Sequence, residues 1–284
     1  MSSMETHLAG STEDRLLSSL HFDSHRTANY VTARTEASYA SSSGGSFSPT
    51  SGIRVMRFSQ NDNSGGFLDG QSIRLAFTIR NEGTAPINPI SMSPASLLNR
   101  IRLTGGGVEI CDVGPDYGRY HEMRCMLKSS AEQLNDMAEG WGASGGGSLT
   151  DQSHADPIPA GGDRRVRSQS YCRLLQKNKK LLLGVTSSRD LGLEMGQPPD
   201  CFEEAVVNYI IVRPTLLASL LQCDGAIMSA FSQHLLSGKF LSYTCPHTAY
   251  VMKSVVTAET YSLPIARGFS RISTILFSFY TGGK

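Results

Sequence analysis

Alternation of apolar and polar residues begins near residue 53 and predicts β-strands. Residues 53–58 (IRVMRF) and 73–80 (IRLAFTIR) place apolar side chains at every second position, which is the period of a strand with one buried face. The DNSGG sequence at residues 62–66 has the composition of a turn. We therefore expect two antiparallel strands here. β-Branched residues predict further strands at residues 206–212, 254–257 and 271–280.

One segment shows helical periodicity instead. In residues 120–139, apolar side chains recur at intervals of three and four, which predicts an amphipathic helix. The residues that set this period are Met123, Met126, Leu127, Leu134 and Met137.

Proline and glycine predict irregular structure on both sides of this helix. Pro86, Pro89 and Pro94 indicate an irregular connection, because proline lacks a backbone donor and disfavours helix in the residue before it. Residues 141–162 hold a Gly/Ser run, two prolines and no apolar period, which predicts an exposed excursion.

The first 50 residues differ from the rest of the chain. Ser and Thr are abundant in them, and they end near SSSGGS at residues 41–46. Such a composition buries too little apolar surface to offset the entropy of ordering. In residues 14–21, however, Leu16, Leu17 and Leu20 share a helical face. We expect a disordered N-terminal arm over residues 1–50 with one short helix.

Composition places the chain among ordinary globular proteins. Its 284 residues are 39% hydrophobic and 18% charged, with a formal net charge of +1, so no global field attracts nucleic acid or anionic lipid. No run of about 18 apolar residues exists to span a bilayer, and residues 1–14 lack the apolar core of a secretion signal. The cysteines lack CxxC spacing, so we expect a reduced, intracellular protein. They are Cys111, Cys125, Cys172, Cys201, Cys223 and Cys245.

Three sequence blocks resemble segments of one protein family. In residues 97–123, LLNRIRL is followed by GGGVEICDV and then by YGRYHEM. The second block is residues 172–183 (CRLLQKNKKLLL), and the third joins QHLLSGK at residues 233–239 to IARGFSRISTILF at residues 265–277. In this order, over roughly residues 53–279, the blocks resemble double jelly-roll major capsid proteins of the polinton-like virus and virophage group.

The resemblance implies a structural capsid protein with no enzymatic activity and no cofactor. Its fold would be all-β, with a first jelly-roll β-sandwich over residues 53–200, including the inserted helix, and the beginning of a second over residues 201–284. Three copies of such a chain form a capsomer that tiles an icosahedral shell. The implied partners are therefore two further copies and the lattice neighbours. The implied locations are the virion and, during assembly, the host cytoplasm or nucleus.

The chain departs from the family pattern in two places. A jelly roll needs about eight strands, but the sequence stops at TGGK, residues 281–284, soon after the strand predicted at residues 271–280. Leu183 stands where the family has proline, and residues 182–195 look shortened. A degraded endogenous copy in a protist genome, a mispredicted gene and a fragment are all consistent with these departures.

One motif suggests enzyme chemistry. Residues 142–146 (GASGG) satisfy the GxSxG pattern around Ser144, but a nucleophile elbow needs a strand before the serine and a helix after it. The glycine-rich surroundings favour an exposed loop, so we predict no catalytic residue. Two alternatives stay open: a host jelly-roll module that binds carbohydrate or a protein partner and, less favoured, a serine hydrolase that uses Ser144.

No convincing metal or acid–base site emerges from the spacing. His121, Glu122 and Cys125 lie close in sequence, but adjacent helical residues point about 100° apart and cannot share one ion. We expect His121 to meet a backbone or acidic group. Cys245 and His247, even with His234, supply too few ligands. The nearby carboxylates are interpreted as solvated strand and loop residues, with one near a helix start: Glu109, Asp112, Asp116 and Glu122.

Two basic segments are candidates for phosphate contact. They are residues 164–167 (RRVR) and residues 177–180 (KNKK). Neither is interleaved with the aromatic residues typical of single-strand binders. A solvated rim of the sandwich is therefore the favoured interpretation, and weak nucleic-acid contact is the alternative.

Overall fold

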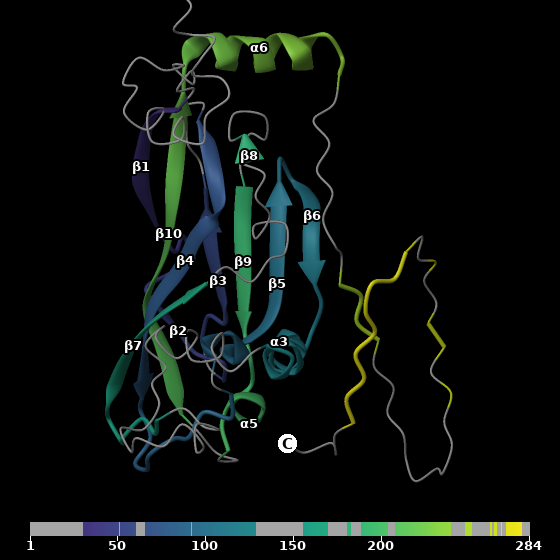
Figure 1. The fold of residues 1–284 in the computed structure, drawn as a ribbon. Helices are drawn as coiled ribbons and strands as arrows, with labels where there is room; N and C mark the ends of the chain where they lie inside the picture. Colours follow the sequence, from purple (N-terminus) through teal and green to yellow (C-terminus); the bar gives the residue numbers. More distant parts are fainter. Residues whose placement is uncertain are drawn as a thin grey trace, which may run out of the picture.

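The computed structural model describes residues 31–50, 52–60, 66–91, 93–128, 156–169, 181–182, 189–203, 208–239 and 248–251, with residues 262, 264–265, 268 and 271–279. In this part of the chain, two antiparallel sheets face each other across one apolar core (Figure 1). No described helix is long and apolar enough to cross a membrane.

The first sheet has the strand order β1-β10-β4-β7. Two strands of 15 residues, β4 (Phe67–Asn81) and β10 (Tyr209–Cys223), form its centre. β1 (Val31–Ala40) and β7 (Asp163–Gln169) are the edges. The short strands are β2 (Ser46–Phe47), which pairs with β10, and β8 (Leu181–Leu182), which pairs with β4.

The second sheet has the order β3-β9-β5-β6. Its strands are β3 (Val55–Ser59), β9 (Arg189–Met195), β5 (Leu98–Gly105) and β6 (Val108–Val113). β5 and β6 form a hairpin, and every neighbouring pair in this sheet is antiparallel.

The path of the chain between the two sheets is that of a jelly roll. With the two-residue strands β2 and β8 set aside, the chain crosses from β1 to β3, returns to β4, and crosses again to the β5–β6 hairpin. It then returns to β7, crosses to β9 and ends in β10. Eight strands connected in this way form the two Greek keys of a jelly roll. The predicted all-β jelly-roll fold is therefore confirmed.

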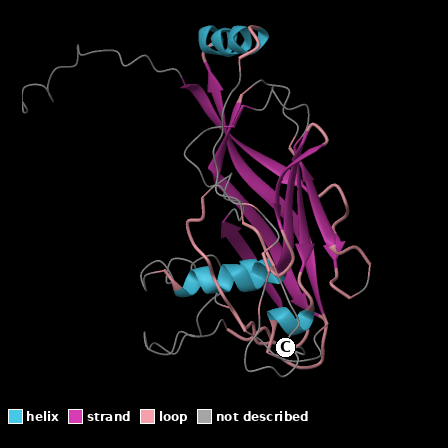
Figure 2. Cartoon of the chain, turned by 90° about the vertical axis from the view of Figure 1, so that its right-hand side faces the viewer, coloured by secondary structure: helices cyan, strands magenta, loops and turns pink. Residues whose placement is uncertain are grey.

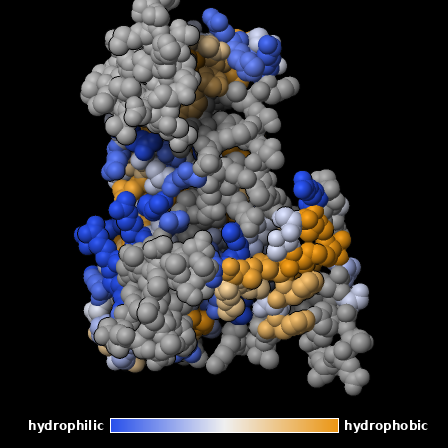
Figure 3. Space-filling model, viewed as in Figure 1, coloured by the Kyte–Doolittle hydropathy of each residue, from blue (hydrophilic) through white to orange (hydrophobic). Residues whose placement is uncertain are grey.

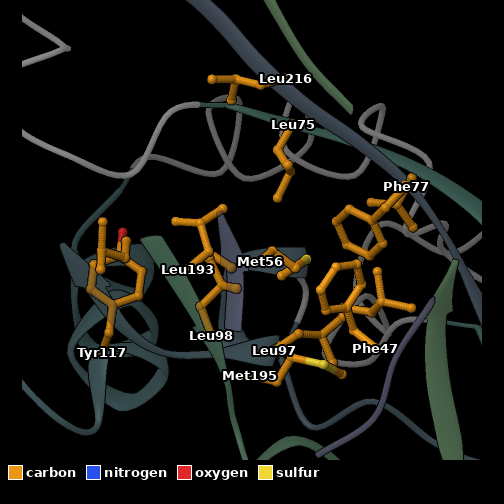
Figure 4. Close-up of a cluster of buried hydrophobic side chains, with 14 of the residues drawn as sticks. Phe47, Met56, Leu75, Phe77, Leu97, Leu98, Tyr117, Leu193, Met195 and Leu216 are labelled. Atoms are coloured by element: carbon orange, nitrogen blue, oxygen red, sulfur yellow. The ribbon is translucent and has the colours of Figure 1, made fainter. Parts of the chain in front are cut away.

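Alternation along the strands builds the core. In β3, Met56 and Phe58 are buried while Arg57 between them is exposed. In β4, Leu75 and Phe77 point from the first sheet toward side chains of the second (Figure 4). Burial of each large apolar side chain contributes about 1.5–3 kcal/mol, so the two-residue period selects which face of each sheet turns inward.

The prediction of a disordered arm is wrong for residues 31–50. β1 pairs antiparallel with β10 from Val31 opposite Cys223 to Ala40 opposite Thr215, and Phe47 in β2 is 1% exposed. A Ser/Thr-rich strand needs no large apolar content of its own when a neighbouring strand satisfies its backbone groups. Residues 1–30, with the predicted short helix, lie outside the described residues.

The strand predicted at residues 206–212 is real but longer, and it belongs to the first sandwich. β10 lies between β1 and β4 in the first sheet, although residues 201–284 were assigned to a second jelly roll. β10 continues through Arg213 and Pro214 by way of a register shift between Val212 and Thr215. A bulge accommodates proline within a sheet.

Short helices occupy the two ends of the sandwich (Figure 2). η1 (Pro94–Leu97), α3 (Tyr117–Met126) and α5 (Pro198–Cys201) lie at one end, and α6 (Gly225–Leu236) lies at the other (Figure 1). The helix predicted at residues 120–139 thus begins earlier, at Tyr117, and residues 129–139 lie outside the described residues. Residues 82–91 are irregular, as the prolines predicted.

Candidate interaction surfaces

α3 and η1 form a tightly packed corner, to which the YGRYHEM motif contributes. The Oγ of Ser93 accepts a hydrogen bond from the N–H of Ala95 at the start of η1, and Pro94 fits the first helical position because its missing N–H would be unpaired there anyway. Glycine at position 118 permits the close approach of α3, since a Cβ there would lie 2.7 Å from the carbonyl oxygen of Ser96. The motif's glycine is therefore required by packing.

His121 connects α3 to the chain around η1. Its Nε2 lies 3.0 Å from the Oγ of Ser93, and its Nδ1 lies 3.3 Å from the hydroxyl oxygen of Tyr117. Both of these groups are hydroxyls. Burial lowers the pKa of His121 to about 3, and the charges of Lys128 and Arg124 act in the same direction. The imidazole is therefore neutral at physiological pH.

Residues 248–251 contact the outer side of the α3 corner. The hydroxyl of Tyr250 donates to Oδ2 of Asp116, and the hydroxyl of Thr248 donates to that of Tyr120 at 3.5 Å. A Cβ on Gly114 would lie 3.6 Å from the Cβ of Tyr250. Asp116 occupies the N-cap position with a φ of 63°, and its side chain makes no capping hydrogen bond. Its carboxylate instead holds a segment from beyond the first sandwich.

The other three carboxylates named from the sequence are an ion-paired, a half-buried and an exposed side chain. Asp112 accepts a hydrogen bond from Nε of Arg100 at 2.8 Å and lies 3.7 Å from Nε of Arg102. This hydrogen bond raises the pKa of Arg100. Burial raises the pKa of Glu122, although Arg119 opposes the shift. Glu109 is exposed on β6.

The described residues contain no group of three or more His, Cys, Asp or Glu side chains that could hold a metal ion. His234, in the last turn of α6, is exposed. Ser144, Cys245 and His247 lie outside the described residues, so the predictions about them stay untested. No disulfide bond joins the described cysteines, which are Cys111, Cys125, Cys201 and Cys223.

α6 is held to the sandwich by one face. Met228, Phe231 and Leu235, spaced at three and four residues, pack against Phe67 of β4 and Leu221 of β10. The rings of Phe67 and Phe231 meet edge to face with centroids 5.4 Å apart. The QHLLSGK motif therefore forms the end of this helix, with Gly238 beyond it at a φ of 76°. Glycine adopts this left-handed conformation without steric cost.

Apolar side chains gather on the surface beyond α6. Among residues 262–279, the described positions are not in a strand, so the strand predicted at residues 271–280 is wrong for residues 271–279. Figure 3 shows these residues as an apolar patch beside the sandwich. Its large exposed side chains are Ile265, Ile272, Ile275, Phe277 and Phe279.

Further exposed apolar side chains lie on β6 and at the end of α3. β6 is an edge strand of the second sheet, and Val108 and Ile110 on it are exposed, as are Met126 and Leu127 at the end of α3. Edge strands that present apolar side chains are sites where another segment or chain can pair.

The basic segment at residues 164–167 lies in β7, an edge strand of the first sheet. Arg164 donates hydrogen bonds to the carbonyl oxygens of Asp156 and Pro157 at 2.5 Å and 3.0 Å. Arg165 and Arg167 are exposed on either side of buried Val166. The second basic segment, residues 177–180, lies outside the described residues.

Comparisons with known proteins find similarity among solved structures. No protein-family model matches the sequence, and no curated protein matches it. A chain in a cryo-EM structure of the Sputnik virophage aligns over 73% of this chain and 52% of its own length, with 9% identity and a TM-score of 0.45. VP54 of PBCV-1 aligns over 75% and 48%, with 11% identity and a TM-score of 0.47. The mavirus major capsid protein aligns over 68% and 48%, with 11% identity and a TM-score of 0.42. This chain thus spans about half the length of the chains that it matches.

Proposed function

We propose that this chain is a structural capsid protein whose described residues contribute one complete jelly roll to a virus shell. The observation that carries the proposal is the strand order, β1-β10-β4-β7 facing β3-β9-β5-β6. The sequence blocks that resemble capsid proteins lie at defined features of this fold. LLNRIRL and GGGVEICDV lie largely in the β5–β6 hairpin, YGRYHEM begins α3, and QHLLSGK ends α6.

Residues 31–223 form the first jelly roll in this proposal, and the residues from 224 onward lead into a second. α6 begins directly after β10 and covers the end of the first sandwich. The chain then reaches the outer side of α3 at Tyr250 and continues into the exposed apolar residues 271–279. A contiguous exposed apolar surface marks a site that another part of a protein covers, and here we propose the sheets of a second jelly roll.

The finer parts of the proposal concern assembly. Three copies would form a capsomer, the capsomers would tile an icosahedral lattice, and the protein would act without catalysis. Its place would be the virion, after assembly in the host cytoplasm or nucleus, with weak contact to packaged nucleic acid. The proposal includes an endogenous copy of such a gene as the source of the chain. Fold alone does not determine function, so the test concerns assembly.

The experiment compares the association of the full chain with that of a polar variant. Ile272→Ser, Ile275→Ser and Phe277→Ser together remove most of the exposed apolar surface of residues 271–279. We expect the original chain to associate heterogeneously in light scattering and the triple variant to shift toward monomer. The matched control replaces three separated exposed apolar residues, Val31, Ile53 and Leu236, by serine, and should associate like the original chain.

In the second part of the experiment, the chain is fused to the later part of the second jelly roll of a related capsid protein. We expect a discrete trimer by analytical ultracentrifugation, because the added strands would cover the apolar surface. A monodisperse, cooperatively melting monomer from the original chain would contradict the proposal, since it would mean that residues 271–279 need no partner.

A further inference from the structure

The outward face of the first sheet carries more arginine than carboxylate at its β4–β7 edge. Positions that point away from the core alternate with buried ones along both strands, and the register places Thr78 opposite Arg165 and Ala76 opposite Arg167. Four arginines and one carboxylate occupy these outward positions: Arg74, Arg80, Asp163, Arg165 and Arg167.

One of these arginines is neutralised by the carboxylate. Arg80 donates to Asp163 through Nε at 2.7 Å and through Nη2 at 2.9 Å. Arg74 donates to the carbonyl oxygens of Gln71 and Ile73, which orients its guanidinium and leaves its charge in place. Arg165 and Arg167 are exposed and form no ion pair with the described carboxylates.

A fifth arginine joins this group from the bulge in β10. Arg213 has a φ of 51°, and its backbone N–H donates to the carbonyl of Gly45 at 2.7 Å, which fixes the bulge. Its side chain is exposed and lies near enough to Asp163 to help lower the pKa of that carboxyl, after the larger effect of Arg80. Arg74, Arg165, Arg167 and Arg213 are called the arginine stripe below.

The outward face of the second sheet is balanced by comparison. Its arginines are Arg57, Arg100 and Arg102, and its carboxylates are Asp112, Asp190 and Glu194. Asp112 pairs with Arg100 and Arg102, and Glu194 pairs with Arg54. The second sheet has a similar architecture, so the arginine excess at the β4–β7 edge is not a general property of the surface.

We propose that the arginine stripe binds the phosphate backbone of nucleic acid. Arg165 and Arg167 are two residues apart on one strand, hence roughly 6.8 Å apart along it, a spacing similar to that of successive phosphates in an extended nucleic-acid strand. Guanidinium groups donate bidentate hydrogen bonds to phosphate oxygens. No aromatic residue occupies the outward positions of β4 and β7, so base stacking is absent and binding is independent of base sequence. The inference rests on the proposed function in one respect, the choice of nucleic acid as the anionic polymer that binds.

The test measures DNA binding by the full chain across a salt series. Fluorescence anisotropy with a labelled DNA duplex gives the dependence of the logarithm of affinity on the logarithm of salt concentration, whose slope is about −0.9 for each phosphate contact. We expect Arg165→Gln with Arg167→Gln to reduce the magnitude of this slope by about two units. The matched control, Arg57→Gln with Arg102→Gln, removes the same charge from the other sheet and should leave the slope unchanged.

Three results would overturn the inference. The first is that the unmodified chain binds no DNA at low salt. The second is that the control pair lowers the magnitude of the slope as much as the stripe pair does. The third is that poly-glutamate, which carries no phosphate, binds the protein as tightly as DNA does. Should the stripe pair fail to fold, Arg213→Gln replaces it, with an expected loss of about one unit of slope. Because binding is read from soluble chain without shell formation, failure here is separate from failure to assemble.

Discussion

β4 and residues 271–279 carry similar apolar patterns, but the apolar side chains of β4 are buried and most of those in residues 271–279 are exposed. In β4, alternate residues such as Leu75 and Phe77 are buried in the core. In residues 271–279, Ile275 and Phe277 are exposed, although the sequence predicts a strand over residues 271–280. β4 has β10 and β7 beside it and the second sheet opposite it, whereas residues 271–279 pair with none of the described strands.

The comparison teaches that alternation is a local condition for a buried strand, and that a partner sheet is the other condition. Burial contributes about 1.5–3 kcal/mol for a large apolar side chain only when water leaves both surfaces. The first sandwich meets this condition within residues 31–223. Residues 271–279 have no such partner among the described strands. The following predictions separate the two regions.

The largest effect should come from truncating phenylalanine in each region. Phe58 of β3 is 0% exposed and Phe277 is 70% exposed. We expect Phe58→Ala to lower the free energy of unfolding by about 3–5 kcal/mol, and Phe277→Ala to change it by about 0.5 kcal/mol or less. Urea denaturation of both variants checks this. Equal losses would mean that Phe277 is packed and that the contrast between the regions is wrong.

Acid should destabilise the first sandwich through His121. Its folded-state pKa is lowered to about 3 from 6.5, so the unfolded chain binds the proton more readily. The stability is complete above about pH 6.5 and is lost as pH falls toward 3, at about 1.4 kcal/mol per pH unit for one proton. Urea midpoints at pH 7 and pH 5 measure the loss.

His121→Gln is the control for this titration. It costs hydrogen bonds at every pH but removes the ionisable group, so its urea midpoint should fall less between pH 7 and pH 5 than that of the original chain. An identical fall in both proteins would assign the acid sensitivity to other groups.

Glycine-to-alanine changes compare the α3 corner with α6. At Gly118 a Cβ would meet the carbonyl oxygen of Ser96 at 2.7 Å, whereas at Gly225, in the first turn of α6, it would meet nothing within 4 Å. Gly118→Ala should cost about 1–3 kcal/mol through overpacking, and Gly225→Ala about 0.5 kcal/mol or less in either direction. Thermal melting distinguishes them, and a neutral Gly118→Ala would show that α3 can shift freely.

The smallest effect should come from the contact between residues 248–251 and the start of α3. Tyr250→Phe removes the hydrogen bond to Asp116 at a cost of about 1 kcal/mol or less. The global melting temperature should hardly move, while amide exchange at residues 248–251 should accelerate. Thr32→Val, which removes an exposed hydrogen bond in β1, should leave that exchange unchanged. Unaltered exchange in Tyr250→Phe would mean that other contacts hold the segment on α3.

Much of the fold followed from local patterns. The period of two at residues 53–58 and 73–80 predicted β3 and part of β4, and the prolines predicted the irregular connection after β4. The arginines of residues 164–167 were recognised as a basic segment, but not as neighbours of Arg213. That grouping depends on β4 lying between β7 and β10, which no spacing in the sequence encodes.

By itself, then, the sequence determined the strands with a clear period of two, at residues 53–58 and 73–80, and which side of each is apolar, because both follow from the geometry of a few consecutive residues. Tertiary structure decided that Ser/Thr-rich β1 is ordered, because its partner β10 is far away in the chain. It also decided where the first sandwich ends. An apolar strand is buried only where a second sheet faces it, and that pairing is made by residues distant in sequence.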